Sequence, residues 1–183
     1  MKIDELLRFN REFVERKEYE QFQTTKYPDK KIAIVTCMDT RLVELLPAAL
    51  GIRNGDVKMI RTAGGVITNP FDSTMRSLLI AVYELGVEEI MIVGHTGCGV
   101  QCMNAHEMLL LITKRGVPEK NIQLLEDAGI DLEKWFHGFD DVYEAVAESV
   151  ELVRRHPLLA SDVTVRGFVI DTCTGLLNPV PAQ

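Results

Sequence analysis

Short, nearly continuous apolar runs, kept apart by amphipathic stretches, constrain the fold of this chain more than any other feature. The runs are Lys31–Thr36, Asp56–Arg61, Glu89–Gly94 and Val163–Ile170. Runs of this length, rich in β-branched residues, are typical of strands in a parallel sheet that is covered on both faces. We therefore expect each run to be a buried strand.

Helical patterns lie between the expected strands. Apolar residues recur at helical spacing in 71–85 and 139–153, and residues 97–114 end in an apolar run before a Gly-Val-Pro break. Residues 117–138 indicate a short helix and a loop inserted before the last long helix. Strands that alternate with helices predict an α/β fold, a single domain over residues 1–183 with a central, mainly parallel β-sheet flanked by helices.

The first 20 residues form a separate feature, an N-terminal helical arm. The arm is charged except for one apolar stripe, and a polar stretch, residues 21–30, joins it to the first strand. The stripe consists of Ile3, Leu6, Leu7, Phe13 and Val14. Such a stripe must pack on something. It can cover its own sheet or reach a second subunit, and the residues alone leave both open.

Composition excludes several classes of protein. Apolar residues make up 46% and charged residues 26% of the 183, which is typical of a folded globule. The net charge of −7, with no Lys/Arg stripe, argues against nucleic-acid binding. The charged N-terminus lacks the apolar core of a signal peptide, and no apolar run is long enough to span a membrane. Four cysteines in such a chain predict a reducing compartment, so we expect a cytoplasmic protein.

Two motifs at strand ends carry the chemistry. Cys37-x-Asp39-x-Arg41 begins where the first strand ends, and His95-x-x-Cys98 begins where the third ends. If these strands are neighbours, their carboxyl ends bring two sulfurs and one imidazole to one point. This ligand set suits Zn²⁺ and leaves a fourth position open, which is typical of a catalytic rather than a structural site.

The occupant of the fourth position stays open at this point: Asp39, Cys102 or water. Alternation in an extended loop would place Asp39 and Arg41 on one side, where the guanidinium can hold the carboxylate by two hydrogen bonds. Cys102 is expected on the same helix face as Cys98, packed in the core, and Cys173 is expected to be inert. Surface or capping roles are expected for His106, His137 and His156.

A glycine-rich segment, Arg61–Gly65, follows the second strand. It matches neither dinucleotide nor nucleoside-triphosphate phosphate loops. We expect its glycine pair to let the backbone lie close to the metal crevice.

Together, Cys37-x-Asp39-x-Arg41, His95-x-x-Cys98 and the R-x-A-G-G segment between them resemble the β-class carbonic anhydrases, in particular their compact prokaryotic and archaeal branch. The resemblance spans about Lys31 to Asp171. It implies that Cys37, His95 and Cys98 hold zinc. It also implies that Asp39 either ligates the metal or, paired with Arg41, orients zinc-bound water.

The implied activity is that of a zinc lyase, the reversible hydration of CO₂ to bicarbonate through a zinc-bound hydroxide. The family also implies a homodimer or larger homo-oligomer, with the arm on the partner subunit. Thr40, Thr62 and Gly97 depart from common family residues at the pocket wall, and no substrate-binding residue or proton shuttle is identified.

Two alternatives remain at this stage. One is hydrolysis of a CO₂-like heterocumulene, CS₂ or COS, on the same scaffold. The other is a non-enzymatic zinc protein in which Cys102 closes the site.

Overall fold

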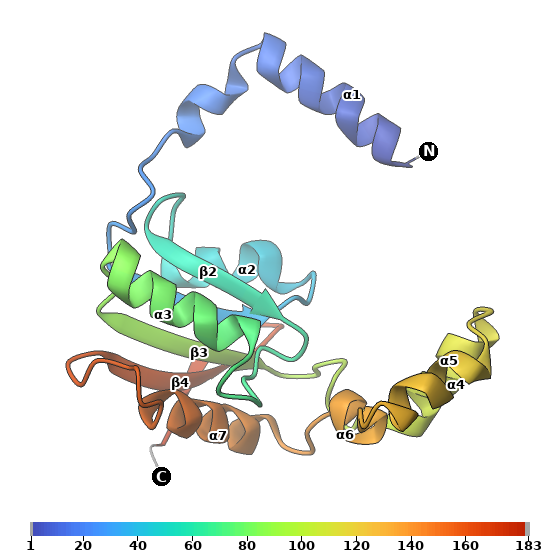
Figure 1. Cartoon of the computed structure of the whole chain (residues 1–183). Helices are drawn as coiled ribbons and strands as arrows, with labels where there is room; N and C mark the ends of the chain where they lie inside the picture. Colours follow the sequence, from blue (N-terminus) through green and yellow to red (C-terminus); the bar gives the residue numbers. More distant parts are fainter. Residues whose placement is uncertain (1, 182–183) are drawn as a thin grey trace.

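The structure, a computed structural model, describes residues 2–181 and is built on one five-stranded sheet in the order β2-β1-β3-β4-β5 (Figure 1). Four strands run parallel, and the last pairs antiparallel with β4. Their bounds are β1 Ile32–Cys37, β2 Val57–Thr62, β3 Glu89–His95, β4 Thr164–Ile170 and β5 Leu177–Val180. The α/β fold is confirmed, and the first and third strands are neighbours, as the site prediction requires.

Helices cover both faces of the sheet. On one face, α3 (Ser73–Leu85) and α7 (Val142–Arg154) bury apolar side chains against alternate residues of β1, β3 and β4. On the other face, α2 (Leu42–Leu50) packs mainly against the residues of the same strands that alternate with these along the chain. Asp72 and Asp141 cap α3 and α7, because their carboxylates accept hydrogen bonds from backbone N–H groups of the first turn.

The stretch between β3 and α7 differs from the prediction. Residues 97–104 form turns and a single β-bridge, between Gln101 and Phe139, and α4 begins only at Ala105 and ends at Lys114. The predicted helical start is wrong because Cys102 has a left-handed backbone (φ 56°) and its N–H bonds the carbonyl of Phe139. Two further helices follow, α5 (Glu119–Asp127) and α6 (Leu132–Phe136), and α4 to α6 project from the side of the sheet (Figure 1). Within residues 2–181, no helix is both long and apolar enough to cross a membrane.

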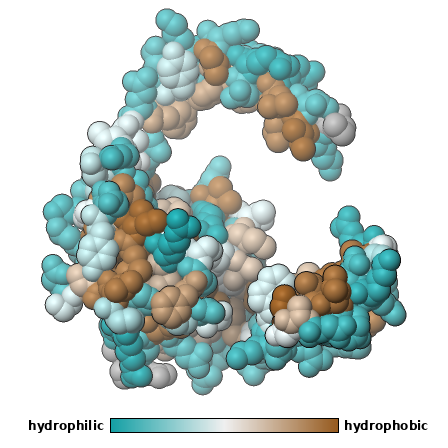
Figure 2. All heavy atoms as spheres, in the orientation of Figure 1, coloured by the Kyte–Doolittle hydropathy of each residue, from teal (hydrophilic) through white to brown (hydrophobic). Residues whose placement is uncertain are grey.

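The N-terminal arm stands away from the sheet. It comprises α1 (Lys2–Glu15) and the 3₁₀ helix η1 (Glu18–Phe22), and none of the α1 residues is buried (Figure 1). Its apolar side chains are open to solvent, Ile3 being 66% and Leu6 70% exposed, and Figure 2 shows apolar atoms along the arm. The interpretation that the stripe covers its own sheet is therefore wrong.

The root of the arm is fastened to the body. The Asn54 side chain donates to the carbonyl of Phe22 (2.6 Å), and the N–H of Asp29 bonds the carbonyl of Gly55 (3.0 Å). The direction in which the arm leaves the body is thus set by hydrogen bonds as well as by the chain path.

Candidate metal centre

Cys37, His95 and Cys98 form one buried cluster at the carboxyl edge of the sheet. Cys37 ends β1, His95 ends β3, and Cys98 lies in the turn that follows. Their three ligand atoms all lie within 4.8 Å of one another, and the two sulfurs are 3.9 Å apart. The cause is the parallel register of β1 and β3, which places the two strand ends side by side.

The cluster fits a tetrahedral zinc ion. Zn–S bonds of about 2.3 Å at tetrahedral angles separate two sulfurs by about 3.8 Å, close to the observed 3.9 Å. The Nδ1 of His95 lies 3.0 Å from the carbonyl oxygen of Thr96, whereas its Nε2 is buried and has no hydrogen-bond partner among the described residues. A neutral imidazole that donates from Nδ1 directs the Nε2 lone pair into the cluster, the tautomer that a metal needs.

Asp39 lies beside this cluster and is held by Arg41. The guanidinium Nε and Nη2 donate to Oδ1 (3.0 Å) and Oδ2 (2.8 Å), and the backbone N–H of Arg41 also donates to Oδ1 (2.9 Å). The pairing confirms the expected contact, but the expected extended loop is wrong, because residues 40 and 41 form a turn. Oδ2 also lies 3.8 Å from the Nε2 of His95, so the carboxylate is next to the cluster.

Charges around the site shift two of its pKa values in the directions that favour the ion pair. The hydrogen bonds from the Arg41 side chain and backbone hold the pKa of Asp39 well below its ordinary value. The same pairing raises the pKa of Arg41. Arg41 also donates to the carbonyl of Gly97 (2.8 Å), so it links the β1 and β3 ends.

The Cys98 thiol is disfavoured as a thiolate in the absence of a cation. Burial raises its pKa, and the neighbouring Cys37 raises it further. A bound divalent cation reverses this balance, because thiols are deprotonated when they coordinate. The site therefore favours a Cys98 thiolate only when a cation is bound beside it.

The glycine-rich segment does lie against the cluster. A Cβ on Gly65 would sit 2.6 Å from the backbone nitrogen of Cys37. Only a glycine lets the chain pass this close to the β1 end, so the expected role of the segment is confirmed.

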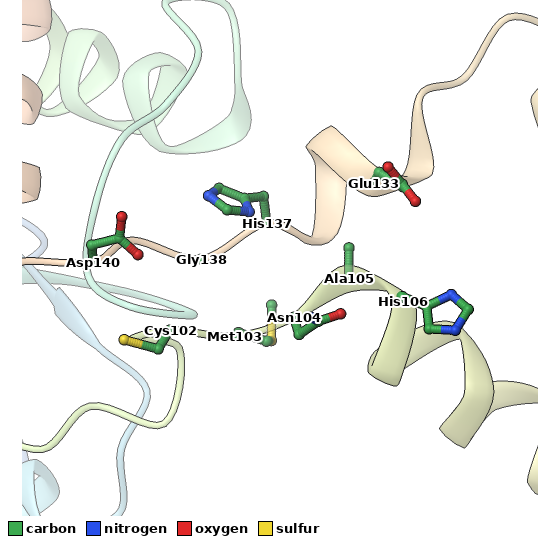
Figure 3. Close-up of a pocket in the computed structure, with 9 residues that line it drawn as sticks. All are labelled: Cys102, Met103, Asn104, Ala105, His106, Glu133, His137, Gly138 and Asp140. Carbon is green, nitrogen blue, oxygen red and sulfur yellow. The ribbon is translucent and has the colours of Figure 1, made fainter.

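The other cysteines and histidines lie outside the cluster. Cys102 is exposed, which contradicts its expected core position, and it lines a cavity of about 380 Å³ with His106 and His137 (Figure 3). The alternative in which Cys102 closes the metal site is therefore wrong. Cys173 is exposed. His156 is buried rather than on the surface, and its Nδ1 accepts from the N–H of Leu158 in a capping contact.

Sequence reasoning missed two threonines next to His95. The hydroxyls of Thr96 and Thr172 lie 3.2 Å apart, and the N–H of Thr172 bonds the Thr96 hydroxyl (3.1 Å). A signal was present, since Thr172 lies two residues beyond the end of β4, the strand that pairs with the His95 strand. The rule that neighbouring carboxyl ends meet would have placed it there.

A mostly parallel sheet whose strand ends carry a buried Cys, His, Cys cluster beside an ion-paired carboxylate defines an α/β protein with a donor set that could hold a metal ion. A family model described as "Carbonic anhydrase" matches residues 32–177. This chain belongs to the β-carbonic anhydrase family, as its motifs predicted.

Individual relatives agree with that assignment. The chain is 49% identical over 176 residues to "Putative carbonic anhydrase YtiB" of Bacillus subtilis, covering 96% of this chain and 94% of the relative. It superimposes on the crystal structure of β-carbonic anhydrase isoform I of Trichomonas vaginalis with a TM-score of 0.87 and 31% identity, covering 100% and 98% of the two chains. It is also 35% identical over 160 residues to a carbon disulfide hydrolase of Acidithiobacillus thiooxidans, covering 82% and 77%.

Proposed function

We propose that this protein catalyses the reversible hydration of CO₂ to bicarbonate, with zinc held by Cys37, His95 and Cys98. The observation that carries the proposal is the convergence of three buried ligand atoms within 4.8 Å, next to the ion-paired Asp39 carboxylate. Bound zinc would supply Lewis acidity, which lowers the pKa of a coordinated water enough to make a nucleophile near neutral pH.

The remaining roles fall to Asp39 and Arg41. Asp39 accepts a hydrogen bond from the attacking water and so orients it. Arg41 holds both carboxylate oxygens, which keeps Asp39 an acceptor and prevents it from becoming a fourth ligand. This division of roles is supported by the two short guanidinium contacts and by the 3.8 Å between Oδ2 and the His95 nitrogen.

Stopped-flow measurement of CO₂ hydration on zinc-loaded protein, with zinc content measured in parallel, tests the proposal. The wild type should bind about one zinc per chain and accelerate hydration, and Cys37→Ser should lose both. Cys173→Ser is the matched control, because it changes an exposed thiol outside the cluster, and it should keep both. Stoichiometric zinc in Cys37→Ser would show that the metal binds elsewhere.

A second candidate is hydrolysis of CS₂ or COS, favoured by the 35% identity to a carbon disulfide hydrolase. The same ligands and the same Asp39 would serve, since these substrates are linear relatives of CO₂. Sulfide release from CS₂ and COS, measured beside CO₂ hydration on one zinc-loaded preparation, decides which substrate the site prefers.

We further propose that the chain works as a homodimer or larger homo-oligomer, with α1 packed on the partner subunit. The chain exposes 12228 Å², whereas a compact monomer of its mass exposes about 8,900 Å². The excess of about 3,300 Å² is larger than the roughly 800 Å² that one partner buries in a standard interface, and larger than the roughly 1,000–2,500 Å² per partner of most obligate dimers. Many of the exposed large apolar side chains lie on the arm and on α4 to α6, which both stand away from the sheet.

The proposed partners are small molecules, CO₂ and bicarbonate, with no nucleic acid and no membrane. A cytoplasmic location is proposed as well. It is supported by the requirement that Cys37 and Cys98 stay reduced in order to bind zinc.

A further inference from the structure

We propose that Thr172 is a positioning residue for the metal centre: it fixes the Thr96 carbonyl that orients the imidazole of His95. The inference rests on the proposed zinc site and adds a residue that lies in neither motif. It assigns to the loop after β4 a part in metal binding.

The first step concerns what orients His95. Its side chain is fully buried, and the acceptor for its Nδ1 is the carbonyl oxygen of Thr96, 3.0 Å away. Metal-binding histidines depend on such an acceptor for ring orientation and tautomer. Here the acceptor belongs to the next residue of the chain, so the ring is only as well fixed as the Thr96 peptide group.

The second step concerns what fixes the backbone of Thr96 on both sides of its Cα. The N–H of Thr96 bonds the carbonyl of Ile170 (3.1 Å), and the N–H of Thr172 bonds the Thr96 hydroxyl (3.1 Å). The Thr172 hydroxyl lies 3.2 Å from the Thr96 hydroxyl and 3.5 Å from the Thr96 carbonyl oxygen. If the Thr96 hydroxyl donates to Thr172 and the Thr172 hydroxyl donates to the carbonyl, every contact is satisfied at once.

The third step concerns the rigidity of Thr172 itself. It stands in a turn closed by Asp171, whose Oδ1 accepts from the N–H groups of Cys173 (2.9 Å) and Thr174 (2.7 Å) and from the Thr174 hydroxyl (2.9 Å). The N–H of Asp171 bonds the carbonyl of Leu176 (2.9 Å). None of these hydrogen bonds involves Cys37, His95 or Cys98, so the turn that presents Thr172 to Thr96 is held by contacts of its own.

The test replaces the Thr172 hydroxyl by a methyl group of similar size, Thr172→Val. We expect the zinc dissociation constant, measured by competition with a chromophoric chelator, to rise about tenfold, the lower end for the loss of such an orienting contact. Thr172→Ser, which keeps the hydroxyl, should return it close to the wild-type value. In ¹⁵N spectra of the metal-free imidazole, the wild type should show the proton on Nδ1, and Thr172→Val should show a mixture of tautomers.

The matched control is Thr174→Val, which removes a hydroxyl from the same turn that touches Asp171 and not Thr96. It keeps both backbone N–H bonds to Asp171 and every Thr172 contact with Thr96, so it should weaken zinc binding much less than Thr172→Val does. Thr172→Ala replaces Thr172→Val if the latter folds poorly in thermal unfolding. Equal zinc affinity in Thr172→Val and the wild type overturns the inference, and so does an equal loss in Thr174→Val. A wild type that binds no zinc overturns the proposed function together with the inference. A wild type that binds zinc, with the same zinc affinity in Thr172→Val, overturns the inference alone.

Discussion

Replacing Gly65 by alanine should damage both the stability of the fold and the metal centre. Gly65 has a left-handed backbone (φ +68°), and an added Cβ would lie 2.6 Å from the nitrogen of Cys37 and 2.8 Å from the carbonyl carbon of Thr36. Both atoms are backbone atoms of β1, which is paired on both sides. The strand end that carries the first metal ligand must therefore move.

The expected cost has two parts. A left-handed conformation costs a non-glycine residue about 1–2 kcal/mol. Displacing packed atoms costs about 1–3 kcal/mol more. Gly86 separates the two, because it has nearly the same backbone (φ +71°) with nothing within 4 Å of its Cβ position. Gly86→Ala should therefore lower the free energy of unfolding only by the cost of the left-handed conformation.

The difference between the two variants is then about 1–3 kcal/mol, or about 2–12 °C in Tm for a chain of this size. Thermal unfolding of the metal-free proteins measures it, and zinc competition on the same samples reports the displacement of Cys37. Gly65→Ala should bind zinc more weakly than Gly86→Ala. Equal Tm values and equal zinc affinities for the two variants would refute the argument from backbone contact.

Three further predictions concern other parts of the molecule. Arg41→Ala should keep zinc but lower the rate of CO₂ hydration about tenfold or more, because the released Asp39 carboxylate can ligate the metal. Zinc content and hydration rate measured on one sample check this, and full activity would contradict it. Deleting residues 1–20 should lower the oligomer mass seen by light scattering or reduce solubility, and an unchanged mass with unchanged melting would exclude an arm on the partner subunit. Hydrogen bonds from Thr174 and Cys173 lower the pKa of Asp171. Its carboxylate therefore stabilises the fold at pH values above the pKa of Asp171 in the unfolded chain, near 3.9, and this stabilisation is lost as the pH falls through the lower pKa of the folded state. Asp171→Asn should therefore melt below the wild type at pH 7, with the gap closing in acid, and a gap independent of pH would contradict this role.

Some parts of the fold escaped prediction for identifiable reasons. Helix α2 is apolar almost all round, so it shows no helical periodicity, and Pro47 in its interior argues against a helix even though its Leu and Ala residues favour one. Strand β5 is four residues long and includes Pro179, which is tolerated because the strand lies at the sheet edge. The turn at Cys102 depends on a bond to Phe139, a contact with a distant part of the chain.

The sequence by itself determined four of the five strands, the parallel sheet and the donor residues Cys37, His95 and Cys98 that the structure brings together. Burial on both faces demands apolar runs, and sulfur and imidazole at two strand ends are the donors that zinc prefers. Only the tertiary structure decided which of these residues meet. The 3.9 Å between the sulfurs, the pairing of Asp39 with Arg41 and the exclusion of Cys102 follow from strand order and turn geometry. Thr172 shows the same division: its position after a strand was readable, but its contact with Thr96 exists only because β3 and β4 lie side by side. Local patterns encode elements and donor types, whereas proximity across the sheet is a property of the packed chain.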